Sequence, residues 1–173
     1  MENFINTTLD TTQLPKFEEV PFTRLHPKYL WIVLCSLSLF IIVIIGAPLG
    51  YDYFNPDEFT NRFWLLFGIS VPIIVVLGTL FSVFIYKKKG YAFRTHDVLY
   101  RHGIIATTTI IIPYNRIQHV ALHEGILARF FGLATIQIYT AGGSSSDLSI
   151  PGIAKSEAEN IKQLLMGKIQ KTL

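Results

Sequence analysis

Two long segments of this chain, at 29–51 and 63–86, contain no charged residue. Each is longer than the roughly 20 apolar residues that a helix needs to cross the ~30 Å hydrocarbon core of a bilayer. Backbone amides find no water to bond in that core, so each segment is expected to be a helix. Aromatic residues stand at the segment ends, as is typical of a membrane interface: Tyr29, Trp31, Tyr51, Trp64 and Tyr86.

Two alternatives to a transmembrane hairpin are disfavoured. A signal peptide has an apolar region of roughly 7–15 residues near the N-terminus, and the first segment is longer and begins later. Two buried helices of a soluble core would rarely lack charge over such lengths. Only 16% of the chain is charged, against about 25% in typical soluble domains. We expect Pro48 to end the first helix and Pro72 to bend the second.

The charges around the two segments predict the topology of the hairpin. The connection, residues 52–62, holds three acids and one Arg. Basic residues flank the pair on its outer sides: Lys16, Arg24, Lys28, Lys87, Lys88, Lys89 and Arg94. Basic residues near the ends of membrane helices stay in the cytoplasm. We therefore expect both termini in the cytoplasm and only the acidic connection outside.

Residues 1–28 show no clear periodicity and are expected to form a mostly irregular cytoplasmic arm. Its simplest role is that of a tether. Contact with a partner is the alternative, because apolar residues recur along the arm: Leu14, Phe17, Val20, Phe22 and Leu25.

Residues 87–173 are expected to form a cytoplasmic domain of several strands followed by one helix. They hold eleven Lys and Arg against five Asp and Glu. Alternation over 134–141 places Ile136 and Ile138 on one face of a strand. A strand that begins near Asp147 should stop at Pro151 and Gly152. An apolar stripe predicts the final helix, and its members are Ala154, Ala158, Ile161, Leu164, Leu165 and Ile169.

The stretch 114–125, YNRIQHVALHEG, gathers polar side chains of the kinds used in catalysis. A strand over 116–123 would hold His119 and His123 about 13 Å apart, at roughly 3.3 Å per residue, too far to share a metal. The zinc signatures H-E-x-x-H and H-x-x-E-H fail, because Val120 and Leu122 stand where Glu is required. The sequence also contains no P-loop and no G-x-S-x-G elbow. We expect a polar strand face, with partner contact by the histidines as the alternative, and no catalytic, metal or cofactor site.

An ordered set of motifs resembles the bacterial pleckstrin-homology-like, membrane-flanked domain family over roughly residues 88–170. The motifs are RIQHV (116–120), Gly125, RFFGLAT (129–135), IYTAGG (138–143) and SIPG (149–152). The resemblance implies an α+β membrane protein: two transmembrane helices, then a pleckstrin-homology-like antiparallel β-barrel capped by a C-terminal helix. It implies tight turns at Gly132 and Gly142. Residues expected to fill the barrel are Ile117, Val120, Leu133 and Ile136.

The same resemblance implies a protein of the bacterial cytoplasmic membrane without enzymatic activity. It further implies a complex with a longer relative that carries repeated copies of the domain. We therefore expect a protein-interaction or scaffold subunit, with contacts made by a barrel edge and the loop 141–147. Membrane lipids and another membrane protein are the expected partners, and no nucleic acid is expected.

Two other functions fit the sequence. One is a module that binds anionic phospholipid headgroups through basic residues: Lys87, Lys88, Lys89, Arg94, Arg101 and Arg116. The three lysines have a simpler explanation, which is that they end the second helix at the membrane interface. The other function is that of an accessory to an enzyme or transporter.

Overall fold

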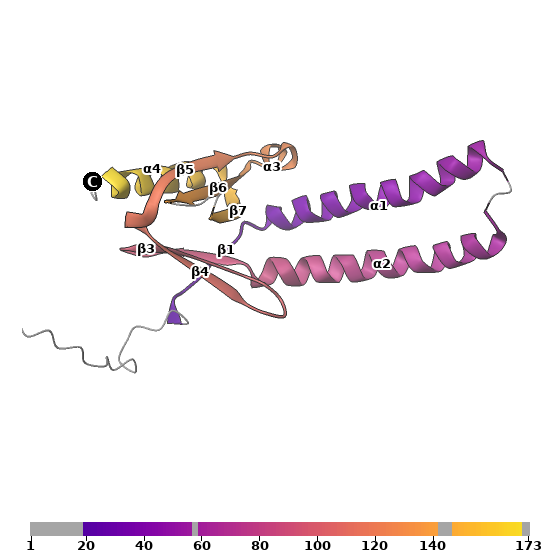
Figure 1. Cartoon of the computed structure of the whole chain (residues 1–173), viewed down its shortest axis with the longest axis horizontal. Helices are drawn as coiled ribbons and strands as arrows, with labels where there is room; N and C mark the ends of the chain where they lie inside the picture. Colours follow the sequence, from indigo (N-terminus) through magenta and orange to yellow (C-terminus); the bar gives the residue numbers. More distant parts are fainter. Residues whose placement is uncertain (1–18, 57–58, 142–146, 171–173) are drawn as a thin grey trace, which may run out of the picture.

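The computed structural model describes residues 19–56, 59–141 and 147–170. It shows a long helical hairpin with a small domain at one end (Figure 1). Helix α1, Lys28–Phe54, and helix α2, Asn61–Lys88, are long and apolar enough to cross a membrane. Neither helix has a buried residue, which agrees with a pair surrounded by lipid. The two expected spans are confirmed as helices.

The prediction that Pro48 ends the first helix is wrong. Helix α1 continues through Pro48 to Phe54, where the Asn55 amide donates to the Tyr51 carbonyl. Proline costs a helix one internal hydrogen bond, and such a loss is tolerated in apolar transmembrane helices. Pro72 likewise lies inside α2.

Two antiparallel sheets form the domain that follows the hairpin. The first has the order β1-β2-β3-β4 and the second β5-β6-β7. The strands of the first sheet are β1 Thr23–Arg24, β2 Gly90–Phe93, β3 Asp97–His102 and β4 Thr108–Pro113. The second sheet contains β5 Ile117–His123, β6 Leu133–Thr140 and β7 Leu148–Ala154. Between the strands lie the 3₁₀ turn η3 Tyr114–Arg116 and helix α3 Ile126–Phe130, and helix α4 Lys155–Gln170 follows them.

Strand β1 comes from the arm that precedes the hairpin. It pairs with β2 through Thr23–Tyr91 and Arg24–Gly90. The next residue, Leu25, is 2% exposed and belongs to the core of the domain. A strand of two residues carries no periodicity, so no sequence pattern predicted it. Leu14 and Phe17 lie outside the described residues.

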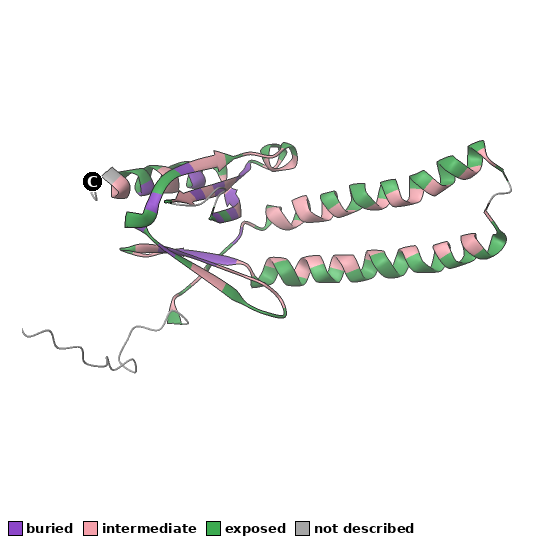
Figure 2. Cartoon of the chain, viewed as in Figure 1, coloured by how far each residue is buried: buried purple, intermediate pink, exposed green. Residues whose placement is uncertain are grey.

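The core lies between the two sheets and α4, as the purple segments in Figure 2 show. Helix α4 packs on β5, β6 and β7 and buries Ala158 and Leu165. The residues expected inside the barrel are all buried: Ile117, Val120, Leu133 and Ile136. The expected fold class, two apolar helices followed by a pleckstrin-homology-like domain with a C-terminal helix, is therefore confirmed.

Strand β7 does not stop at Pro151 and Gly152, contrary to the prediction. The pairing with β6 shifts register between Ala134–Ile153 and Ile136–Ile150. Two residues of β7 therefore stand opposite one residue of β6, which is a β-bulge. Proline is tolerated in a strand at a bulge, and Gly152 supplies the positive φ of +68° that the bulge requires.

This bulge joins the domain to the hairpin. The His26 amide donates to the Gly152 carbonyl at 2.8 Å. The Tyr29 ring packs directly against Gly152, so that a Cβ added there would lie 2.6 Å from Tyr29 Cγ. On the other helix, the Tyr86 hydroxyl donates to the Leu25 carbonyl at 3.1 Å. Both helices are thus fixed to the domain core, and the site described below lies beside this joint.

Candidate functional site: a basic cleft at the membrane junction

A cleft of about 550 Å³ opens where α2 meets the first sheet. Its lining combines the end of α2 with residues of β1, β2, β3 and the loop before β4. The lining residues are Phe22, Arg24, Phe84, Lys87, Lys88, Lys89, Gly90, Arg101 and Thr107. Five of them are cationic and none is a carboxylate, so the cleft suits an anion.

Strand register brings the two arginines of the cleft together. Gly90 pairs with Arg24 on β1 and with Arg101 on β3. Neighbouring strands are about 4.8 Å apart, so the arginine backbones are held roughly 10 Å apart across a residue without a side chain. The guanidinium carbon of Arg101 lies 4.0 Å from the centroid of the Phe22 ring. This cation–π contact leaves the guanidinium hydrogens available to an anion.

The lysines enter the cleft because α2 ends there. Lys89 caps the helix with φ −82° and ψ 138°, and the chain turns directly into β2. Its ammonium lies 5.5 Å from the centroid of the Tyr29 ring. Burial lowers the pKa of Lys89, because removing water penalises the charged ammonium. A bound anion would offset that penalty.

The structure separates the six basic residues that the sequence singled out. Lys87, Lys88, Lys89 and Arg101 line the cleft, whereas Arg94 and Arg116 do not. Arg24 was not among the six, since it precedes the hairpin and the pairing of β1 with β2 was not predicted. Its place just before a membrane segment, matching the lysines after the other segment, was a signal that could have suggested it.

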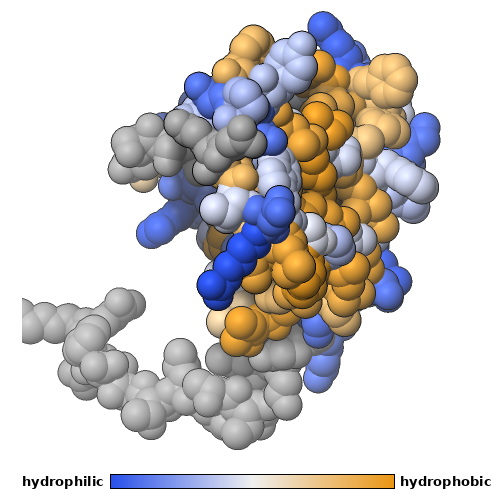
Figure 3. Space-filling model, turned by 90° about the vertical axis from the view of Figure 1, so that its right-hand side faces the viewer, coloured by the Kyte–Doolittle hydropathy of each residue, from blue (hydrophilic) through white to orange (hydrophobic). Residues whose placement is uncertain are grey.

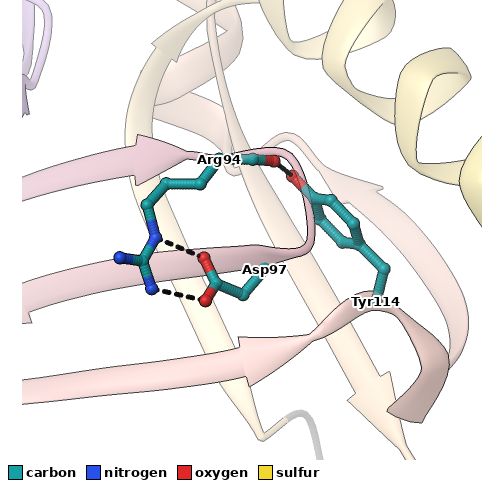
Figure 4. A network of polar contacts seen from close by, with 3 residues as sticks. All are labelled: Arg94, Asp97 and Tyr114. Carbon is teal, nitrogen blue, oxygen red and sulfur yellow. Dashed lines mark hydrogen bonds and ion pairs between the residues drawn. The ribbon is translucent and has the colours of Figure 1, made fainter. Parts of the chain in front are cut away.

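Arg94 belongs to a structural network with Asp97 and Tyr114 (Figure 4). It follows the end of β2 that is opposite to Gly90, where α2 joins the domain. It forms a two-pronged ion pair with Asp97, with Nε 2.6 Å from Oδ1 and Nη2 bonded to Oδ2. The Tyr114 hydroxyl donates to the Arg94 carbonyl at 2.6 Å. The hydrogen bonds to Asp97 raise the pKa of Arg94. The partner carboxylate neutralises this arginine, which makes it a poor anion ligand.

Arg116 lies near the end of β6, where it shares a surface hollow with Thr140 and Asp147. Asp147 accepts hydrogen bonds from the Thr140 amide at 2.7 Å and the Thr140 hydroxyl at 2.5 Å. These two bonds lower the pKa of Asp147. The acid ties together the two ends of the predicted loop 141–147, whose residues 142–146 lie outside the described part of the chain.

Within the stretch 114–125, residues 114–116 form η3 and residues 117–123 form β5. Gln118, His119 and His123 are exposed, whereas Tyr114 is buried. The His119 ring stacks on Tyr139 of β6 with centroids 4.1 Å apart. Over residues 19–56, 59–141 and 147–170, no three His, Cys, Asp or Glu side chains are grouped so that they could hold a metal ion.

Comparisons with known proteins place this architecture in a family. The family model described as "Bacterial PH domain" matches residues 12–169. The chain is 30% identical over 135 residues to UPF0699 transmembrane protein YdbS of Bacillus subtilis (strain 168), covering 75% of this chain and 78% of that protein. It is 29% identical over 148 residues to UPF0699 transmembrane protein YdbT of the same strain, covering 84% of this chain but 29% of the longer protein. No solved structure matches. With nearly its whole length matched, the chain belongs to the bacterial PH domain family, and it is similar to two UPF0699 transmembrane proteins.

Proposed function

We propose that this chain is a non-enzymatic module of the bacterial cytoplasmic membrane whose basic cleft binds the headgroups of anionic phospholipids. The observation that carries the proposal is the composition of the cleft. Five cationic side chains and no carboxylate line a hollow at the end of a membrane-spanning helix.

The location of the cleft favours a lipid over a soluble anion. Lys87 and Lys88 form the last turn of α2, so the cleft opens at the height where phospholipid phosphates lie. Each basic residue near an anionic membrane surface contributes about 1 kcal/mol of attraction. The two arginines add planar donors that match phosphate oxygens. The basic residues flanking the hairpin support an orientation in which this end of the molecule faces the cytoplasm.

The proposal is tested with the full-length protein in nanodiscs or detergent, by measuring its preference for phosphatidylglycerol over phosphatidylcholine with native mass spectrometry. The double variant Lys88→Gln and Arg101→Gln removes two charges from the cleft. We expect a loss of about 2 kcal/mol, or roughly thirtyfold in preference.

A matched double variant, Arg116→Gln and Lys162→Gln, removes the same charge outside the cleft. It should leave the lipid preference nearly unchanged. Equal losses in the two double variants would mean that the lipid preference depends on total charge alone, so the cleft would not be a lipid-binding site.

An interaction or scaffold role is a second candidate, favoured by the two relatives. The chain resembles both a short transmembrane protein and part of a longer one in the same bacterium. The longer protein has length enough for further copies of this module, and the two apolar helices bury no residue within the chain. Purification of the tagged full-length chain in a gentle detergent tests this role. A stoichiometric longer relative would support it, and recovery of the chain with lipid alone would count against it.

A further inference from the structure

We infer that the domain rests on the bilayer through two apolar tips that enter the membrane interface on either side of the hairpin. One is the β3–β4 tip, the loop of residues 103–107 between these two strands. The other is the α3 tip, formed by Ile126 and Phe130. This inference requires only that α1 and α2 cross a membrane. It does not require the cleft to bind a headgroup.

The most exposed large hydrophobic side chains of the domain are found on these two tips. Ile105 is 96% exposed, Ile126 92% and Phe130 85%. Elsewhere in the described part of the domain, the exposed large hydrophobic residues Ile111, Leu164 and Met166 are between 39% and 49% exposed. Nearly complete exposure of an isoleucine or phenylalanine to water is unfavourable, and the concentration of three such residues indicates a surface that is covered.

The β3–β4 tip projects from the domain because its backbone turns tightly. Gly103 has φ +108°, and a Cβ there would lie 2.0 Å from the Ala106 carbonyl oxygen. Only glycine fits this close turn, which brings Ile105 to the end of the loop. Thr107 at the base of the tip lines the cleft together with Phe84 of α2. Phe84 precedes Lys88 by four residues, about 6 Å along the helix axis, so the tip reaches the depth at which α2 is already apolar.

The α3 tip lies beside the other helix. Helix α3 contacts α1, and in Figure 1 it stands beside the first turns of α1, while the loop between β3 and β4 stands beside the last turns of α2. Ile126 and Phe130 are one turn apart on α3, with the exposed Arg129 next to Phe130. An apolar pair with an adjacent cation is the arrangement of interfacial helices, whose cations remain among the headgroups.

The bilayer is the occupant that accounts for both tips. They emerge from different sheets, yet both point along the hairpin toward its apolar segments (Figure 1). Viewed along the hairpin from its loop end, a band of hydrophobic surface runs through the molecule, with hydrophilic groups at the margin and one hydrophilic group lying across the front (Figure 3). A membrane surrounding α1 and α2 is continuous with both tips. A second protein would have to pass around the hairpin to cover the two together.

Spin labels on the full-length chain test this placement. Cys35 is the one cysteine of the sequence, so a Cys35→Ser background allows single labels at Ile105→Cys, Ile126→Cys and, as the control, Leu164→Cys. Leu164 is exposed on α4, which extends toward the end of the domain away from the hairpin (Figure 1). Collision rates with oxygen, which concentrates in lipid, and with a water-soluble nickel complex are measured in nanodiscs of phosphatidylcholine alone.

We expect the labels at 105 and 126 to collide with oxygen and to lose most collisions with nickel, while the label at 164 collides freely with nickel. Nickel collisions at 105 and 126 equal to those at 164 would overturn the inference. Protection from both reagents would also overturn it, because it would mean burial against protein. Phosphatidylcholine carries no net charge, so a positive result stands even if the cleft variants show no headgroup preference.

Discussion

The two ends of the domain treat charge in opposite ways. At the end that meets the hairpin, five cationic side chains line one cleft without a carboxylate among them. At the far end, Arg94 is paired with Asp97, and Asp147 is bonded to Thr140. The far end therefore uses charge to close turns of the chain, whereas the near end leaves charge available for a ligand.

The number of basic residues in a region therefore does not locate a binding site. Arg94 lies in the turn directly after β2, Arg101 lies on β3, and both were singled out from the sequence as possible lipid ligands. Asp97, three residues after Arg94, makes that arginine structural. Arg101 instead pairs in register with Gly90 and lies on an aromatic ring. The fold decides which residues surround each arginine, and these neighbours give Arg94 a structural role and leave Arg101 available to a ligand.

The largest effect on stability is expected where Gly152 of the domain packs against Tyr29 of α1. Gly152→Ala places a methyl group 2.6 Å from the Tyr29 ring carbon, at a residue with φ +68°. Left-handed backbone costs alanine about 1–2 kcal/mol, and overpacking adds about 1–3 kcal/mol. The free energy of unfolding should fall by the sum of the two, measured by denaturation of the detergent-solubilised protein.

Gly132→Ala is the matched control for that variant. Gly132 also has φ +68°, but nothing lies within 4 Å of the position of its Cβ. It should show the backbone cost alone, about 1–2 kcal/mol. Equal losses in the two variants would mean that Tyr29 moves aside without cost and that the joint is loose.

A smaller effect is expected at the far end. Tyr114→Phe removes the hydroxyl that donates to the Arg94 carbonyl, and one such hydrogen bond contributes about 1 kcal/mol to stability. Tyr139→Phe deletes a hydroxyl that bonds the Gln137 side chain on the half-exposed face of β6. It should change stability by less than about 0.5 kcal/mol.

Thermal unfolding in detergent measures both tyrosine variants, and lipid preference is measured alongside. Neither variant should change the preference for anionic lipid, because the far end takes no part in the cleft. A loss of lipid preference in Tyr114→Phe would mean that the far end influences lipid binding, which would contradict the proposed difference between the two ends.

Much of the fold could be predicted from sequence because its signals are local. Uncharged length predicted α1 and α2, and alternation predicted β6 with Ile136 and Ile138 buried. Pro48 and the Pro151–Gly152 pair were misread for a common reason. Each is a breaker by local rules, but an apolar helix in lipid and a bulged strand both accommodate proline.

The candidate site could be predicted only in part, because it is assembled by long-range pairing. Three of its lysines are consecutive at a helix end and were found from the sequence. Arg24 joins them only because β1 pairs with β2 across the whole hairpin, a contact between residues more than sixty positions apart. No local pattern reports such a pairing.

A pH dependence of lipid preference that reports on Lys89 should have about the same size as the effect of Tyr114→Phe. Burial lowers the pKa of its ammonium below the ordinary 10.5, so as pH rises this lysine should lose its charge earlier than an ordinary lysine does. Its attraction to an anionic headgroup is present below the lowered pKa and is lost as the pH rises through it. The loss of one charge corresponds to about 1 kcal/mol, roughly fivefold in preference for phosphatidylglycerol.

The measurement is that lipid preference as the pH rises from neutrality while it stays below the ordinary lysine pKa of 10.5. The wild-type preference should fall more over this interval than that of Lys89→Gln, which should start lower. Lys88→Gln is the matched control, since it removes a neighbouring exposed lysine and should keep the fall. A fall that survives in Lys89→Gln would assign the titration to another group. Lys89 would then contribute nothing specific to lipid binding, and the cleft would attract headgroups only through its overall positive charge.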